Sequence, residues 1–404
     1  MNTKQTPPRD AGAQRPSPDW DARAPAVLQD QIRAYDDMRH RCPVAYSEYL
    51  NWSLFRHHDV IQALTDPKTF SNAVSSYPSI PNGMDPPEHT AYRMLIDPYF
   101  APEAMARFEP VCRRIAVDLV RELPSAGEVE LMGQFAEDFA LQIQCAFMGW
   151  PVALHAPLRR WTHRNRAATL AADRAAMAAV ALEFDGYIRA QLDARRAAGD
   201  QAPDDVTRRL LGETLQGRTL SDAEIVSIVR NWTVGELSTI SSCVGILTQY
   251  LAEQAELQQR LRQQPELLPA AIDEILRIHA PLIANRRIAT RDVEIGGCQL
   301  KAGDRVTLIW ASANRDETVF GDADEFRLDR EPADNLLYGA GIHVCPGAPL
   351  ARLELKIVME ALLSQTERIG TLAGKTPVRA SYPASGYASL PLWIERAAGP
   401  AHQA

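Results

Sequence analysis

Apolar residues recur three and four positions apart through most of this 404-residue sequence, which is the spacing of amphipathic helices. The pattern covers 101–120, 134–148, 171–195, 221–252, 256–279 and 350–366. Strand signals are short and lie at 50–55 and 285–310. We therefore predict a mainly α fold with small β-sheets. It forms one large domain over 26–396, between a flexible N-terminal tail at 1–25 and a C-terminal tail at 397–404.

Charge and hydropathy exclude two classes of partner. The formal net charge is −8 and no run of Lys and Arg with interleaved aromatic residues occurs, so we expect no nucleic acid. No apolar stretch reaches the roughly 18–20 residues that span a bilayer, so we expect no membrane. The N-terminus is polar and proline-rich and lacks the apolar core of a signal peptide, which predicts a cytoplasmic protein.

Six cysteines are spread along the chain without any CxxC or CxxCH spacing. This spread disfavours a disulfide framework, a zinc site and covalently attached c-type haem. Five of the cysteines are expected to be small buried hydrophobic residues. Cys345 differs because of its neighbours.

Cys345 lies in YGAGIHVCPG (338–347), a glycine-rich run just before the predicted helix at 350–366. The free N–H groups and dipole of a helix N-terminus stabilise a thiolate. Gly339, Gly341 and Gly347 would let the backbone approach a flat ligand closely. A nucleophilic cysteine would need a base, and His343 is the only local candidate. A phosphate-binding glycine loop would need a third glycine at a fixed spacing, and the sequence does not place one at that spacing after Gly339 and Gly341. A thiolate ligand to a single iron needs neither.

The loop resembles the haem loop of cytochromes P450, written FGxGxHxCxG, with Tyr338 at the position of the phenylalanine. The resemblance implies the cytochrome P450 fold and non-covalent haem b (heme, iron protoporphyrin IX). Cys345 would be the metal ligand. The surrounding cofactor-binding residues would be Tyr338, Gly339, His343 and Gly347.

Other stretches match the same family. Glu274 and Arg277 fit its Glu-x-x-Arg pair on a buried helix, and 314–330 resembles the meander that holds this pair. His89 and Arg93 resemble the HxxxR contact to the haem propionates. The position of Arg287 is that of another propionate arginine.

The helix expected at 221–252 would lie over the distal face of the haem and carry the proton relay. The family pattern (A/G)-G-x-(D/E)-T aligns with GELST, so Thr239 supplies the alcohol while Ser238 takes the usual place of the acid. Glu236 lies three residues before Thr239 and can share its helical face. Two interpretations stay open: a displaced relay through Glu236, or a Glu236 that is satisfied elsewhere or solvated.

The resemblance implies a monooxygenase that inserts one atom of O2 into a small or medium hydrophobic or aromatic substrate, by hydroxylation or oxidative dealkylation. The expected pocket walls are mostly apolar: 73–84, Thr233, Val234, 282–284 and 386–388. A peroxygenase driven by hydrogen peroxide, a non-enzymatic haem sensor or carrier and a cysteine hydrolase are the alternatives.

Several segments resemble the haem domain of self-sufficient bacterial P450s, in which a reductase is fused to the haem domain, or their stand-alone relatives. The 404 residues contain no ferredoxin cysteine cluster and no dinucleotide fingerprint. Electrons from NAD(P)H are therefore expected through a separate ferredoxin or reductase, or through a fused reductase domain absent from this sequence.

Overall fold

Helices dominate the computed structural model, which describes residues 17–75 and 77–397. The predicted helical segments are confirmed. They correspond to α5 (Pro102–Glu122), α6 (Glu137–Met148), α8 (Arg174–Ala198), α10 (Asp222–Glu253) and α15 (Ala348–Gln365). The segment 256–279 forms two helices, α11 (Ala255–Gln263) and α12 (Leu268–His279), because Pro265 between them has no N–H for a helical hydrogen bond.

Contacts within the chain divide it into two compact units. Unit 1 comprises 1–90, 277–345 and 381–383, and unit 2 comprises 91–276, 346–380 and 384–404. Parts of the expected tails, 1–16 and 398–404, lie outside the described residues. Trp20 is 8% exposed and packs in the core of unit 1, so ordered packing begins before residue 26. The domain limits 26–396 stay a prediction.

Unit 1 is built around a five-stranded sheet of order β1-β2-β10-β7-β3. Its strands are β1 (Val44–Ser47), β2 (Asn51–Leu54), β3 (Phe70–Ser71), β7 (Ala284–Ala289) and β10 (Arg305–Ile309). The pair β2 and β10 is parallel and the other pairs are antiparallel. A hairpin of β8 (Val293–Ile295) and β9 (Cys298–Leu300) joins two of the strands. The strands predicted at 50–55 and 285–310 are therefore confirmed.

Short helices complete unit 1. They are α1 (Pro25–Gln29), α2 (Gln31–Arg41), α3 (His57–Thr65), α13 (Trp310–Ala313) and α14 (Glu317–Phe320). Apolar side chains of α3 and the sheet share one core, in which Leu54, Val60 and Leu308 are fully buried. This core supports α3, against which the cysteine loop lies.

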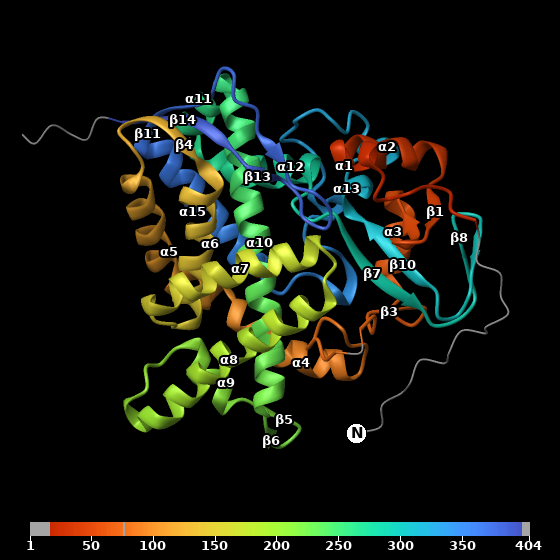
Figure 1. Cartoon of the computed structure of the whole chain (residues 1–404), viewed down its shortest axis with the longest axis horizontal. Helices are drawn as coiled ribbons and strands as arrows, with labels where there is room; N and C mark the ends of the chain where they lie inside the picture. Colours follow the sequence, from red (N-terminus) through yellow and green to blue (C-terminus); the bar gives the residue numbers. More distant parts are fainter. Residues whose placement is uncertain (1–16, 76, 398–404) are drawn as a thin grey trace, which may run out of the picture. The chain divides into compact units, whose positions relative to one another are not determined.

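Unit 2 is a helical body around α10, which runs as one long helix with α5, α6 and α15 close by (Figure 1). Unit 2 also contains α8, α11 and most of α12, together with α7 (His155–Leu170), α9 (Val206–Gly212) and most of α4 (Glu88–Ile96). A three-stranded antiparallel sheet has the order β11-β14-β4, from Thr366–Thr371, Pro391–Arg396 and Ala126–Glu130. Two-stranded ribbons add β5 (Thr214–Leu215) with β6 (Arg218–Thr219), and β12 (Val378–Arg379) with β13 (Tyr387–Ser389).

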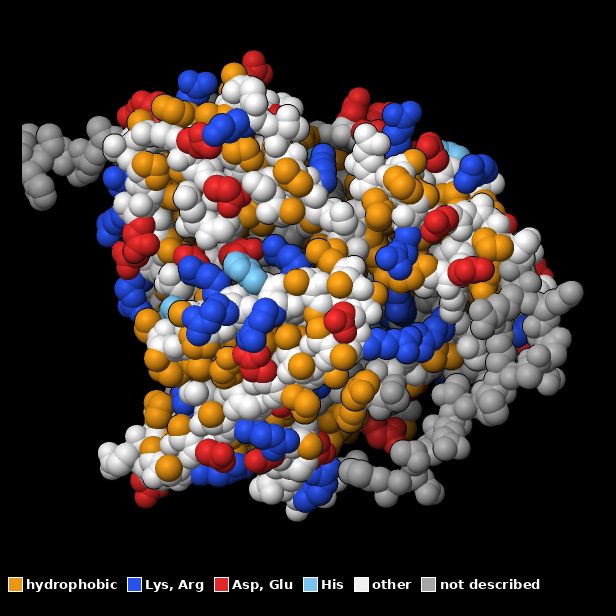
Figure 2. All heavy atoms as spheres, viewed as in Figure 1, with side chains coloured by type: hydrophobic (Ala, Val, Ile, Leu, Met, Phe, Trp, Pro, Cys, Tyr) orange, Lys and Arg blue, Asp and Glu red, His pale blue; other side chains and the backbone are white. Residues whose placement is uncertain are grey.

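Side chains of both signs are spread over the face drawn in Figure 2. Among the described residues, the structure contains no helix that is both long and apolar enough to cross a membrane.

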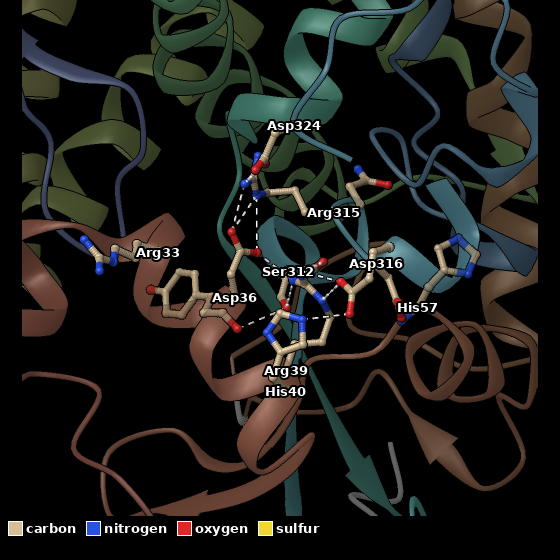
Figure 3. Close-up of polar contacts among 12 residues, drawn as sticks. Arg33, Asp36, Arg39, His40, His57, Ser312, Arg315, Asp316 and Asp324 are labelled. Atoms are coloured by element: carbon tan, nitrogen blue, oxygen red, sulfur yellow. Dashed lines mark hydrogen bonds and ion pairs between the residues drawn. The ribbon is translucent and has the colours of Figure 1, made fainter. Parts of the chain in front are cut away.

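A charged cluster in unit 1 ties α2 to the segment after α13 (Figure 3). Asp36 accepts hydrogen bonds from Arg39 at 2.6 Å and from Arg315 at 2.8 Å. Both guanidinium groups are buried, with side chains 5% and 9% exposed. Each also has a second carboxylate, Glu317 for Arg39 and Asp324 for Arg315. Asp36 is thus the carboxylate that the two cations share.

We expect Asp36→Ala to lower the free energy of unfolding by about 3 kcal/mol, because two buried guanidinium groups lose a common partner. Urea unfolding of the haem-loaded protein measures this change. The neighbouring Asp37 is exposed, so Asp37→Ala is the matched control and should change stability by less than about 0.5 kcal/mol. Equal stabilities of the two variants would contradict this role of Asp36.

Candidate functional site

The cysteine loop of unit 1 presents its thiol at the surface of that unit. Cys345 is exposed, and its backbone N–H donates to the carbonyl oxygen of Tyr338 at 2.9 Å, which closes the loop. Helix α15 begins at Ala348 with Gly347 as its N-cap, two residues after the cysteine. The predicted position of Cys345 just before a helix N-terminus is therefore confirmed.

Two glycines give the loop its path. Gly339 and Gly341 have φ values of +76° and +68°, which residues with a side chain rarely adopt. A Cβ atom on Gly341 would lie 2.5 Å from the carbonyl oxygen of Leu64 at the end of α3. A Cβ on Gly339 would only reach ordinary contact, 3.7 Å from the ring of Trp310. Gly341 therefore lets the loop lie directly on the α3 backbone.

Apolar and aromatic residues are the sequence neighbours of Cys345 in the loop. Ile342 and Val344 are 39% and 40% exposed, although both are large hydrophobic residues. The ring of His343 lies 4.1 Å from that of His89, between ring centroids, and His89 is only 2% exposed. The predicted residues Tyr338, His343 and Cys345 lie in the loop, and His89 of the same unit contacts the loop at His343.

Arg287, on β7, is a buried cation. It is 2% exposed and donates to the backbone carbonyl of Arg286 at 2.7 Å. Burial lowers the pKa of Arg287 to about 10, and the charge of Asp85 acts in the opposite direction. No ion pair with a carboxylate compensates this cation among the described residues. An anionic group of a ligand would do so.

These observations fit a haem. A single exposed thiol can ligate one iron, and exposed apolar residues beside it suit the flat face of a macrocycle. A buried arginine without a carboxylate partner suits a propionate. The positive φ at Gly339 and Gly341 shows that the loop takes a path that a residue with a side chain would rarely follow.

The Glu-x-x-Arg residues are buried, as the resemblance implies. Glu274 and Arg277 lie three residues apart on α12 and are 5% and 1% exposed. Arg277 donates to the carbonyl oxygens of Asn314 and Ala323, both inside the segment predicted to be the meander, at 2.6 and 2.9 Å. Its guanidinium also lies 4.6 Å from the ring centroid of Phe320. Arg277 therefore anchors the chain that leads into the cysteine loop.

The predicted relay residues lie on α10 in unit 2. Ser238 is exposed, and its hydroxyl donates to the carbonyl of Val234 within the same helix at 3.1 Å. Thr239 is half-buried, whereas Glu236 is 9% exposed. Burial excludes a freely solvated Glu236 and leaves two possibilities, a displaced relay and a Glu236 that is satisfied elsewhere.

Arg93, on α4, belongs to unit 2 and donates to Asp97 at 2.7 Å. The expected pocket walls divide into two groups. Val234 and Leu282 are 41% and 42% exposed, whereas Thr233 and Ile283 are buried in the cores of their units. Thr233 accepts a hydrogen bond from Gln144 at 2.8 Å, so its hydroxyl is already engaged.

Glu354 is a buried acid that our reading of the sequence missed. It lies on α15, is 0% exposed, and contacts Glu236 of α10. Its position four residues after Leu350 and four before Val358 places it on the buried face of the helix. A charged residue in the middle of an apolar helical face is the signal that would have revealed it.

Comparisons with known proteins agree with this geometry. The family model described as Cytochrome P450 matches residues 151–367, more than half of the chain. "Cytochrome P450 109" of Bacillus spizizenii is 32% identical over 82% of this chain and 83% of its own length. "Linalool 8-monooxygenase" of Pseudomonas putida is 30% identical over 78% of this chain and 83% of its own length. The structure of CYP109E1 from Bacillus megaterium in complex with corticosterone has a TM-score of 0.81 and 27% identity, and covers 92% of this chain and 100% of that one.

We expect Gly341→Ala to weaken haem retention more than Gly339→Ala. Both variants place a side chain at positive φ, which costs about 1–2 kcal/mol. Only the first also forces a Cβ against the backbone of Leu64. The haem-to-protein absorbance ratio after gel filtration measures retention. Equal ratios for the two variants would show that contact with α3 does not hold the loop.

Proposed function

The chain belongs to the cytochrome P450 family, and from this premise we propose that it inserts one atom of O2 into a small or medium hydrophobic or aromatic substrate. It is an oxidoreductase with the mainly helical P450 fold, and its cofactor is haem b. The exposed thiol of Cys345, at the end of a loop held by two glycines, is the observation that carries the proposal.

Each loop residue has a proposed task. The thiolate of Cys345 is the iron ligand, and the helix N-terminus that follows favours its charged form. Gly341 keeps the loop close to α3, and Gly339 supplies the second positive φ of the loop. The ring of His343 packs on His89. The carbonyl oxygen of Tyr338 accepts the 2.9 Å hydrogen bond from the Cys345 N–H. Gly347 is the N-cap of α15, the helix that follows the cysteine.

The cationic residues are proposed to hold the propionates. Arg287 supports this role best, because its buried charge has no ion pair with a carboxylate among the described residues. His89 and Arg93 carry the family motif, although Arg93 also pairs with Asp97. When bound, haem supplies the activation of O2 and the transfer of an oxygen atom.

The residues of α10 are proposed to deliver protons. Thr239 offers a hydroxyl, and Glu236, one turn earlier, offers a buried carboxyl. Ser238 cannot take the place of the acid, because a hydroxyl does not give up its proton near neutral pH. Its hydrogen bond to Val234 also turns it toward its own helix.

The substrate class is inferred from exposed apolar side chains and from relatives. Val234 and Leu282 are large hydrophobic residues that stay about two-fifths exposed in their units. A relative is named for linalool, and solved relatives contain corticosterone and testosterone. These names describe other proteins, and all of them denote largely apolar molecules, in line with the proposed class for this chain.

Electrons from NAD(P)H are proposed to arrive through a ferredoxin and reductase in the cytoplasm, from separate chains or from a fused reductase domain. The lack of a ferredoxin cysteine cluster and of a dinucleotide fingerprint in these 404 residues supports an outside source.

We expect the reduced protein under carbon monoxide to show a Soret band at about 450 nm, the family's mark of thiolate ligation. Cys345→Ser should lose this band, because an alcohol does not replace the thiolate. Cys298→Ser is the matched control, since Cys298 is another cysteine of unit 1 and lies in the β8–β9 hairpin. A band at about 420 nm in the well-folded wild type would refute the proposal.

A peroxygenase is the second candidate, because Ser238 occupies the usual position of the acid. This candidate predicts turnover with hydrogen peroxide comparable to that with a reductase and O2. The monooxygenase proposal predicts turnover that is at least about tenfold faster with the reductase, as delivered protons then matter. Parallel assays on one aromatic substrate decide between them.

A further inference from the structure

Two acidic side chains from different helices of unit 2 meet inside the protein. Glu236 of α10 and Glu354 of α15 are 9% and 0% exposed, and their carboxyl groups lie within hydrogen-bonding reach of each other. Helix α5 packs against α15, and α15 packs against α10. The pair is therefore enclosed by helices on more than one side.

No cation compensates the pair among the described residues. Neither glutamate takes part in a salt bridge, and Glu236 Oε1 and both carboxyl oxygens of Glu354 are buried without an N–H or O–H donor. The titratable groups nearby are the thiols of Cys112 on α5 and Cys243 on α10, together with Asp273 on α12. Asp273 is itself paired with Arg352 at 3.0 Å. The two carboxyl groups therefore depend on each other.

Two ionised carboxylates are not stable side by side in this buried site, because their charges repel and no cation among the described residues compensates them. Burial raises the pKa of both Glu236 and Glu354, and the negative charge of Glu236 raises the pKa of Glu354 further. Each oxygen that lacks a donor gains one only if a carboxyl group carries a proton. A single proton between the two groups makes an O–H···O⁻ hydrogen bond, which is short and strong. Such a proton belongs to the pair rather than to either residue.

We propose that Glu236 and Glu354 hold one proton between them at neutral pH, and that this proton serves Thr239 one helical turn further along α10. The second part rests on the monooxygenase function proposed above. The shared proton moves from the Glu354 oxygen to the Glu236 oxygen, and from there to the hydroxyl of Thr239. The O–H bond of Thr239 breaks in the same relay, and its proton goes to the O2 that is being reduced by electrons from the redox partner. Water then returns a proton to the pair. Glu354 does not reach Thr239 in this sequence of steps and is a positioning residue that keeps Glu236 protonated.

The first test is the pH dependence of stability of the haem-loaded protein. The folded pKa values are raised, so the stabilisation from the shared proton is complete below the unfolded pKa of about 4.3 and is lost as pH rises through the folded values. We compare the factor by which the unfolding constant rises per pH unit between about pH 7 and 8. This factor should be about ten times larger for the wild type than for the double variant Glu236→Gln/Glu354→Gln, because only the wild type loses one proton on unfolding.

The double variant is suited to this test because two amides hydrogen-bond to each other without a bound proton. Glu266→Gln, at an exposed glutamate of unit 2, is the control and should keep the wild-type slope. Equal slopes for the wild type and the double variant would overturn the shared proton. This measurement needs no substrate and no redox partner.

The second test asks whether the proton is used. Glu236→Gln and Glu354→Gln should each lower the fraction of electrons that end in product by about tenfold while the carbon monoxide band at about 450 nm stays. In Glu354→Gln this fraction of electrons should fall further as the pH rises, because Glu236 no longer shares a proton with a second carboxyl group and ionises more readily. Unchanged coupling in both variants would overturn the delivery role. An absent band in the wild type would instead refute the haem-thiolate proposal and leave the stability test valid.

Discussion

The burial of arginine side chains in unit 1 is the constraint on which the cysteine loop depends. A buried guanidinium carries several N–H donors, and each needs an acceptor. Arg277 finds two of them in the carbonyl oxygens of Asn314 and Ala323, while Arg315 donates to the carbonyl of Ile278 at the end of α12 and to Asp36 of α2. Backbone carbonyls cannot move without moving the chain. The route toward Cys345 is therefore set by cations that hold its upstream backbone, and α3 supports the loop itself.

Local spacing explains why much of the fold was predictable. The helices α5, α8, α10 and α15 have clear apolar faces, and their limits agree with the predicted segments to within a few residues. Strands β4, β11 and β14 were missed. Their pairing joins segments far apart in the chain, which local spacing does not report. Helix α7 was missed because its sequence is rich in Arg and His and its apolar positions are few. Periodicity reports the face that an element buries, and it does not report the partner.

The same limit applies to the candidate site. The loop around Cys345 was recognisable because its residues are contiguous. Gly339 and Gly341 adopt the positive φ that the pattern suggested, whereas Gly347, with φ −81°, does not. Glu236 could be placed on α10 but its surroundings could not, since they come from α15. The sequence left open whether Glu236 is solvated, and only burial beside Glu354 resolves that point. Asp36 shows the limit again, because its two arginine partners come from α2 itself and from a segment of distant sequence.

The two units handle buried charge in opposite ways. Unit 1 buries Arg287 with no ion pair to a carboxylate among the described residues, so it favours an anionic ligand group. Unit 2 buries two acids with no cation, so it favours the uptake of a proton. Both are unfavourable for the protein alone, because an uncompensated buried charge costs several kcal/mol, roughly the effect of breaking a buried ion pair. Such costs persist where a ligand or a proton compensates them. Because Arg287 belongs to unit 1 and the two glutamates belong to unit 2, we expect anion binding at Arg287 and the proposed shared proton to be separable properties. A substitution in one core can abolish one of them and leave the other intact.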